Sequence, residues 1–392
     1  GQGSYLTDGK AGMSSGKSVT ERLFSFFARA NYSYQDKYML SASIRHEGSS
    51  KFAADNRWAN FWSATAGWRI SNEEFMKDFD WLDDLKIRFG YGVTGNNDFS
   101  ATYMANMLGS DTNWMMPNGT WAYSYGKSQN VNPNLGWEEK KEWNLGVDYS
   151  FFEGRLYGKF DYYRREVDNL LFSVKVPQPP YTQGSQMQNI GSMESKGWEF
   201  EVGGDIIRTK DFTWSSSMNL SHNTGKILTL EGDNSYHNGN GFVAPGTPGD
   251  AARMEAGSTI GSFYMWKFAG FDDEGSFLLY NKDGEVIPAA QKTENDKQYI
   301  GNYTPKLIIG WSHTLTYKNF DLGINLRSWI DFDVYNTINM YYGIQGQGNL
   351  NVLKDAYGKF NHIKGEKQIC DYFLEDGTFL KIDAITLGYT LP

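Results

Sequence analysis

The stretch WNLGVDYSFFEGRLYGKFDYY, residues 143–163, alternates between apolar and polar side chains almost without error. Trp143, Leu145 and Val147 stand on one side of the alternation, with Asn, Gly and Asp between them. After the Glu-Gly pair at 153–154 the alternation resumes. A period of two predicts a β-hairpin with one apolar face and one polar face. The apolar face must therefore contact either a second sheet or lipid.

The same rhythm recurs along most of the chain. A change of phase near Ala384 and Ile385 predicts a β-bulge in the last segment. Several segments are longer than the roughly 9–11 residues that a tilted membrane-spanning strand needs. In a soluble sandwich, turns would recur every 8–12 residues or so. We therefore expect the apolar face to contact lipid. The alternating segments are 24–34, 38–45, 62–70, 85–94, 198–206, 212–220, 307–317, 320–330 and 379–389.

Composition is compatible with this interpretation and excludes several others. The chain has 392 residues, a mean hydropathy of −0.56 and 16% aromatic residues. No run approaches the ~20 apolar residues of a spanning helix. A polar lumen and aromatic girdles give a β-barrel this composition, although a carbohydrate-binding sandwich could share it. The net charge of −9 argues against nucleic acid as a partner. The single cysteine, Cys370, excludes an intrachain disulfide.

The connections fall into two classes. Some are tight, at 35–37, 153–154, 208–211 and 317–319. Others are long and rich in Gly, Asn and aromatic residues. Short turns at one end and long loops at the other are typical of an outer-membrane barrel. The long loops, which we expect to be extracellular, are 96–136, 175–194, 223–261 and 331–378.

One segment, 71–86, has a helical pattern. Ser71 followed by Glu74 matches a capping box, which satisfies two backbone N–H groups at a helix start. We therefore expect a short helical turn at one end of the barrel.

The residues also resemble a known family. LKIRFGYGVTGNND (85–98), NIGSMESKGWEFEV (189–202) and GNYTPKLIIGWSHTLTYKNFDL (301–322) resemble blocks of the SusC/RagA-type TonB-linked outer-membrane proteins of Bacteroidetes. The blocks follow one another in the family's order and cover most of the chain. Further blocks of this kind are 23–76, 132–171, 261–275 and 373–392.

The resemblance implies an all-β fold, a transmembrane antiparallel β-barrel of about 22 strands. It implies a place in the bacterial outer membrane and import of a large nutrient, an oligosaccharide or a peptide. A SusD-like surface lipoprotein would cover the loops, and the TonB complex would open the lumen by pulling on an N-terminal plug. Nothing in residues 1–392 resembles that plug or the TonB box, and the family continues past LGYTLP with two more strands. We therefore expect the C-terminal part of a barrel, with the plug domain and the last strands absent.

Loop 96–136 supplies the candidate ligand-binding residues. Aromatic faces stack on sugar rings or hold peptide side chains, and the neighbouring Asn and Ser supply hydrogen bonds. The alternative is that these rings pack the loops together or against a partner protein. The candidates are Tyr103, Trp114, Trp121, Tyr123 and Tyr125.

A metal site and catalysis have weaker support. Asp272, Asp273 and Asp283 are hard oxygen ligands that could hold Ca²⁺, but Asp283-Gly284 reads more simply as a hairpin turn. The five histidines are scattered, without metalloprotease or triad spacing, so we expect no enzyme. The alternatives to active import are a passive porin, a surface-binding barrel and, third, a soluble sandwich. A plug and a TonB box upstream would decide for import.

Overall fold

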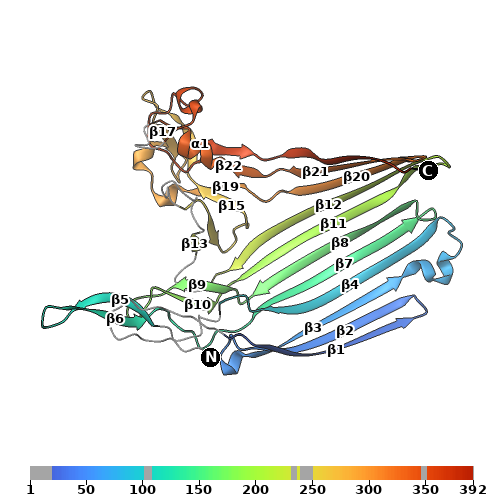
Figure 1. The fold of residues 1–392 in the computed structure, drawn as a ribbon, viewed down its shortest axis with the longest axis horizontal. Coiled ribbons are helices and arrows are strands. Elements are labelled where there is room, and N and C mark those ends of the chain that lie inside the picture. The colour runs from blue at the N-terminus through green and yellow to red at the C-terminus, as the bar shows by residue number, and fades with distance from the viewer. Residues whose placement is uncertain (1–19, 101–107, 231–235, 239–249, 346–350, 392) are drawn as a thin grey trace.

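A single antiparallel sheet forms most of the molecule. The computed structural model describes residues 20–100, 108–230, 236–238, 250–345 and 351–391. Eleven strands form the main sheet, each paired with its neighbours along the chain, as Figure 1 shows. In spatial order they are β1 (Leu23–Tyr34), β2 (Tyr38–Ser49), β3 (Trp58–Arg69), β4 (Leu82–Asn96), β7 (Glu138–Phe151), β8 (Leu156–Asp168), β11 (Ser192–Arg208), β12 (Phe212–Thr229), β20 (Leu307–Tyr317), β21 (Phe320–Ile330) and β24 (Phe379–Tyr389).

The register confirms the predicted alternation. Leu145 pairs with Tyr162 and Val147 with Phe160, so one row of apolar residues crosses β7 and β8. Phe160 in turn pairs with Phe200 of β11. Large apolar side chains of this face are exposed along the whole sheet, among them Leu387 at 73%. Among the described residues, β1 and β24 are the two edge strands of the sheet and do not pair with each other, so the barrel is partial.

The strands are joined by short turns at one end of the sheet and by long connections at the other, and we call these the turn end and the loop end (Figure 1). At the turn end, Gln35, Asp36 and Lys318 adopt positive φ angles of 52°. Such angles match the right-handed twist of the strands in a tight hairpin. None of the helices in the described part of the chain has the length and apolarity that crossing a membrane requires.

The loop end carries small sheets and short helices in place of plain loops. The pairs are β5 (Leu108–Met115) with β6 (Trp121–Lys127), β9 (Leu171–Lys175) with β10 (Ser185–Asn189), β13 (Tyr236–Asn238) with β14 (Arg253–Glu255), β15 (Ser262–Met265) with β19 (Gln298–Asn302), and β22 (Asp333–Tyr335) with β23 (Leu374–Asp376). A three-stranded sheet contains β16 (Lys267–Phe271), β17 (Phe277–Tyr280) and β18 (Val286–Pro288), and α1 is Thr337–Tyr342.

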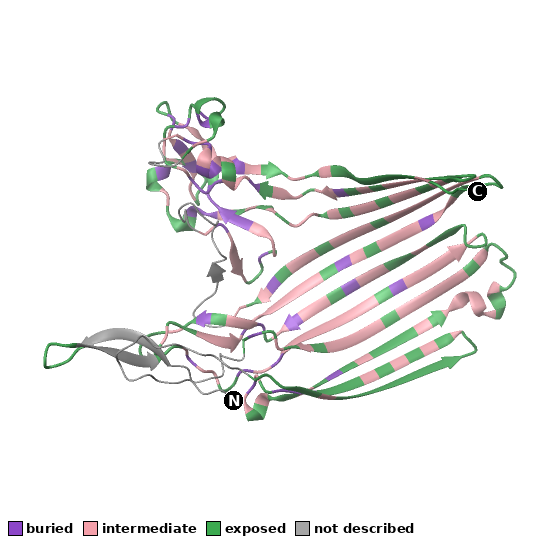
Figure 2. Ribbon diagram, viewed as in Figure 1, coloured by how far each residue is buried: buried purple, intermediate pink, exposed green. Residues whose placement is uncertain are grey.

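Most buried side chains lie at the loop end, as Figure 2 shows. The larger cluster, which we call the loop module, is built from residues 251–373. Met265, Leu279, Met340 and Cys370 are fully buried there. A smaller cluster joins β3 and the end of β4 to the 97–137 loop. Of the predicted loop 223–261, residues 223–229 belong to β12, and Ala251 is buried in the loop module.

The short helical turn expected within 71–86 is confirmed, but the capping box predicted at its start is not. The segment contains two three-residue 3-10 turns, and β4 already begins at Leu82. Ser71 does not cap a helix, because its hydroxyl donates to an Asp84 carboxylate oxygen (3.0 Å). The predicted bulge in β24 is confirmed at Asp383, one residue before Ala384, where the register with β21 shifts.

Candidate functional site: the polar sheet face and the loop end

An ion-pair network lies on the polar face of β4, β7 and β8. The Arg88 guanidinium donates to both carboxylate oxygens of Asp148 (2.8 and 2.9 Å) and to Asp161 (3.1 Å). Lys86 adds a longer contact to Asp148 (3.6 Å). Gly146 makes room for the network, because a Cβ there would collide with the Arg88 and Asp161 side chains. These charges lie on the face opposite to Val147, so the sheet has a charged side and an apolar side.

The charged side continues from this network toward the turn end, at Lys159, and toward the loop end, at Arg165. Lys159 pairs with Glu201 (3.1 Å), and Arg165 pairs with Glu142 (2.9 Å). The Arg165 guanidinium also lies 4.2 Å from the centre of the Tyr163 ring. Half-exposed ion pairs of this kind contribute little stability each but keep a surface wetted. The polar face therefore suits the wall of a water-filled lumen.

A polar pocket of about 590 Å³ opens at the loop end beside β9 and β10. Its lining is mostly hydroxyl and carboxamide groups, with Lys175 as a cation. Such groups both donate and accept hydrogen bonds, as binding of sugar hydroxyls or peptide groups requires. The lining residues are Ser100, Ser128, Gln129, Asn130, Ser173, Lys175, Gln183, Gly184, Ser185, Gln186 and Met187.

Two buried or half-buried asparagines join the loops around this pocket. The Asn130 carboxamide donates to the carbonyls of Gln183 (2.7 Å) and Ser185 (2.9 Å). The Asn189 carboxamide donates to the carbonyl of Gly136 (2.9 Å) and accepts from its N–H (2.7 Å). The 97–137 and 169–191 loops are therefore held together by side chain to backbone hydrogen bonds.

Charged groups inside the loop module are satisfied by the fold. Lys297 is 6% exposed, donates to the Asp250 carbonyl (2.9 Å) and lies over the Trp266 ring (4.4 Å). The pKa of Asp296 is lowered, chiefly by the hydrogen bond that its carboxylate accepts from the Lys282 backbone N–H, and also by hydrogen bonds from Thr293. Burial raises the pKa of the Cys370 thiol to about 12. Lys297 and Asp296 therefore stabilise the module through these contacts, and the buried Cys370 thiol stays protonated and unreactive.

Four of the five predicted aromatic residues belong to the β5–β6 hairpin. Trp114 is in β5, and Trp121, Tyr123 and Tyr125 are in β6. Tyr103 lies outside the described residues. Ligand binding by these five residues stays a prediction. The polar pocket was not predicted, although the Ser, Gln and Asn in 128–130 and 183–189 are the signal that could have indicated it.

The acidic segment forms tight turns. Asp272 accepts hydrogen bonds from the N–H groups of Glu274 (3.0 Å) and Ser276 (2.7 Å). The predicted hairpin turn at Asp283-Gly284 is confirmed between β17 and β18. Within the described ranges, no group of three or more His, Cys, Asp or Glu side chains is placed to hold a metal ion. Calcium binding by Asp272, Asp273 and Asp283 stays a prediction.

Comparisons with known proteins agree with this geometry. Residues 2–336 match the family "TonB dependent receptor-like, beta-barrel". The TonB-dependent receptor SusC of Bacteroides thetaiotaomicron is 33% identical over 94% of this chain and 38% of its own length. The TonB-dependent receptor P3 of Formosa agariphila is 31% identical over 94% of this chain and 38% of its own length.

Solved structures give the same result. The RagAB peptide transporter is 25% identical and matches with a TM-score of 0.78, over 95% of this chain and 41% of that chain. The chain thus spans 38% of the length of the first two curated relatives. Since the relatives are outer-membrane barrels, the apolar face of the sheet contacts outer-membrane lipid and the charged face lines the lumen. The chain belongs to the TonB-dependent receptor-like β-barrel family and is of the SusC/RagA type.

Proposed function

We propose that this chain is part of an outer-membrane importer that takes up a large nutrient, an oligosaccharide or a peptide, at the expense of energy delivered through TonB. The observation that carries the proposal is the match of the whole sheet to RagAB together with the family match over 2–336. The barrel would bind, enclose and conduct its cargo and carry out no covalent chemistry. The charged lumen face around Arg88 and the polar pocket beside β9 suit a hydrated cargo.

We also infer a SusD-like surface lipoprotein as partner. The relatives SusC and RagAB support this, RagAB being a complex described as a peptide transporter. The loop module also supports a lipoprotein partner, because its packed core forms a rigid surface at the loop end that such a partner could bind. The partner that supplies energy would be the TonB complex.

The test uses the full-length protein in its own bacterium. A strain lacking the gene is grown on a panel of oligosaccharides and peptides, with and without a functional TonB gene. We expect growth on one of these substrate classes to require both the gene and TonB. Uptake that depends on the gene but persists without TonB would instead show a passive porin. Binding without any uptake would show a surface receptor.

A second arm addresses the polar pocket. Replacing Gln186 with Leu removes one carboxamide from the lining and should weaken cargo uptake while the protein reaches the membrane in normal amounts. The matched control is Gln291→Leu, in a 3-10 turn of the loop module away from this lining. Equal uptake by the two variants would show that the pocket does not bind the cargo, and the proposed import function would still stand.

A further inference from the structure

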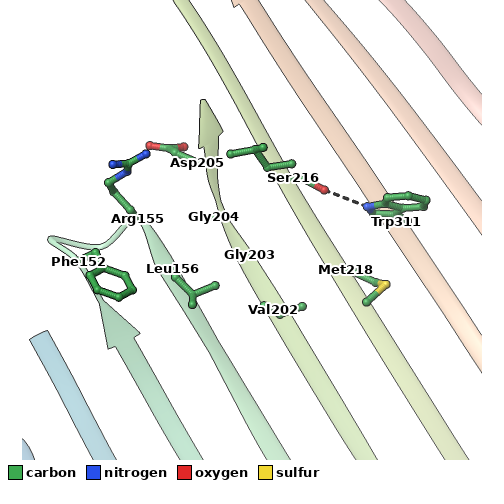
Figure 3. A pocket seen from close by; sticks show the side chains of 11 residues that line it. Phe152, Arg155, Leu156, Val202, Gly203, Gly204, Asp205, Ser216, Met218 and Trp311 are labelled. Carbon is green, nitrogen blue, oxygen red and sulfur yellow. Dashed lines mark hydrogen bonds between the residues drawn. The ribbon is translucent and has the colours of Figure 1, made fainter. Parts of the chain in front are cut away.

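A groove of about 430 Å³ opens on the lipid-facing side of the sheet, near its turn end. Figure 3 shows it over β8, β11, β12 and β20, with Val202 and Met218 on its floor. Phe152 and Trp311 lie on opposite sides of it. The strands beneath it are paired on both sides, so further barrel strands extend the sheet without covering the groove. Its occupant must therefore come from the membrane or from another protein.

The groove is hollow because β11 has no side chain at Gly203 and Gly204, and because the turn between β7 and β8 borders it. Gly204 has the register of the lipid face, and a Cβ at this position would collide with the carbonyl oxygen of Arg155. The Asp205 N–H donates to that same carbonyl (2.9 Å). A bulge follows immediately at Ile206, where the register with β12 shifts. The backbone itself thus shapes the hollow.

The turn between β7 and β8 is held in place by Asp83 of β4. Phe152, Glu153 and Gly154 all have positive φ angles, between 57° and 76°. The Asp83 carboxylate accepts hydrogen bonds from the N–H groups of Glu153 (3.0 Å) and Gly154 (2.8 Å). These contacts fix the turn that carries Phe152 and Arg155 to the rim of the groove.

The rim carries a cation that the fold does not neutralise. Arg155 and Asp205 lie at the turn-end rim in Figure 3. Asp205 accepts from the Ser215 hydroxyl (2.6 Å) and pairs with Arg208 (3.5 Å). Within the described part of the chain, no carboxylate lies within ion-pair distance of the Arg155 guanidinium. An apolar groove with a cation at its membrane-surface end has the chemistry of a lipid tail and an anionic headgroup.

We propose that this groove binds one anionic phospholipid of the periplasmic leaflet, with an acyl chain along Val202 and Met218 and the phosphate at Arg155. The leaflet follows from the turns, because short turns face the periplasm in barrels of this kind. The acyl chain fills a space that protein atoms leave empty. The phosphate gives the Arg155 guanidinium an anionic partner at the membrane surface.

The test measures lipid retained by the purified full-length protein in nanodiscs that contain equal amounts of phosphatidylglycerol and phosphatidylcholine. Mass spectrometry of the retained lipid should show enrichment of phosphatidylglycerol. Arg155→Gln should reduce this enrichment about fivefold, since one cation at a membrane surface contributes on that order. Lys210→Gln is the matched control, because Lys210 is a cation of the next turn that does not line the groove. Its enrichment should match the wild type.

A second pair of variants tests the groove itself. Val202→Phe fills the hollow and should reduce retention of phosphatidylglycerol, whereas Leu145→Phe, on the same face outside the groove, should not. Inorganic phosphate alone should not displace the lipid. Wild-type enrichment in both Arg155→Gln and Val202→Phe would overturn the proposal. Equal losses in Arg155→Gln and Lys210→Gln, or displacement by phosphate alone, would overturn it as well.

Discussion

The sheet and the loop module use apolar side chains in opposite ways. In the loop module, Met265, Met340 and Phe373 are at most 2% exposed and bury one another, as in a water-soluble domain. In the sheet, Leu145 and Phe160 are 44% and 39% exposed, and the charged groups lie on the other face. The same residue types therefore stabilise one region by contact with protein and the other by contact with lipid. The two regions should respond differently to the same substitutions.

The largest expected difference is between two Phe→Ala changes. Phe373→Ala should destabilise the loop module by about 3–5 kcal/mol, because it leaves a cavity in a protein core. Phe160→Ala in the sheet should cost much less, since lipid tails refill the space. Limited proteolysis of the loops and the heat-modifiable band of the barrel measure the two regions separately. Similar losses in both variants would show that the sheet face is packed against protein.

The second difference lies across a single strand. Val147→Arg should hinder assembly in the membrane, because an arginine near the bilayer midplane costs about 2–4 kcal/mol. Asn144→Arg, on the lumen face of the same strand, should assemble normally. The yield of heat-modifiable protein in outer membranes compares the two. Normal assembly of the Val147 variant together with loss of the Asn144 variant would reverse the assigned faces.

A smaller effect is expected for the lumen network. Arg88→Gln leaves the Asp148 and Asp161 carboxylates side by side around Gly146. Because the Arg88 side chain is about one-third exposed, water screens the network and we expect a loss of only about 1 kcal/mol. Adding Asp148→Asn should recover part of it. A double-mutant cycle on urea midpoints gives the coupling, and strictly additive losses would mean that the network is not coupled.

The smallest effect concerns Glu73 at the turn end. Its pKa is lowered to about 2, chiefly by the hydrogen bond from Tyr38, with further bonds from Trp68 and Lys37. A lowered pKa stabilises the fold above the ordinary glutamate value, and this contribution disappears as the pH falls toward 2. Glu73→Gln should therefore lower the melting temperature slightly at pH 7 and not at pH 2. A deficit that is independent of pH would assign the effect to packing.

The strands of the wall could be predicted from sequence, and most of the loop end could not. Alternation gives the face of a residue such as Val147 directly, because a strand has a period of two. The capping box predicted from Ser71 and Glu74 does not form, because the Ser71 hydroxyl donates to Asp84, 13 residues away in β4. Local patterns carry no information on such partners.

The loop module and the polar pocket were missed for the same reason. Trp266, Met340 and Cys370 come from three separate segments, none of which has a regular period. The pocket likewise combines residues near 100, 128–130, 173–175 and 183–187. Their proximity follows from hydrogen bonds of Asn130 and Asn189 to backbone groups more than fifty residues away. Composition indicates that such loops are polar and aromatic, but it does not indicate which of their residues come into contact.

The most direct test is a cysteine scan of β7 in the full-length protein, with Cys370→Ser as background. Leu145→Cys and Val147→Cys, labelled with a fluorophore, should be quenched by a lipid-phase quencher and not by a water-soluble one. Asn144→Cys and Asp148→Cys should show the reverse, because they face the lumen. The predicted result is quenching that alternates from residue to residue. Quenching of all four positions by the water-soluble reagent alone would contradict the assignment of this sheet as a lipid-facing barrel wall.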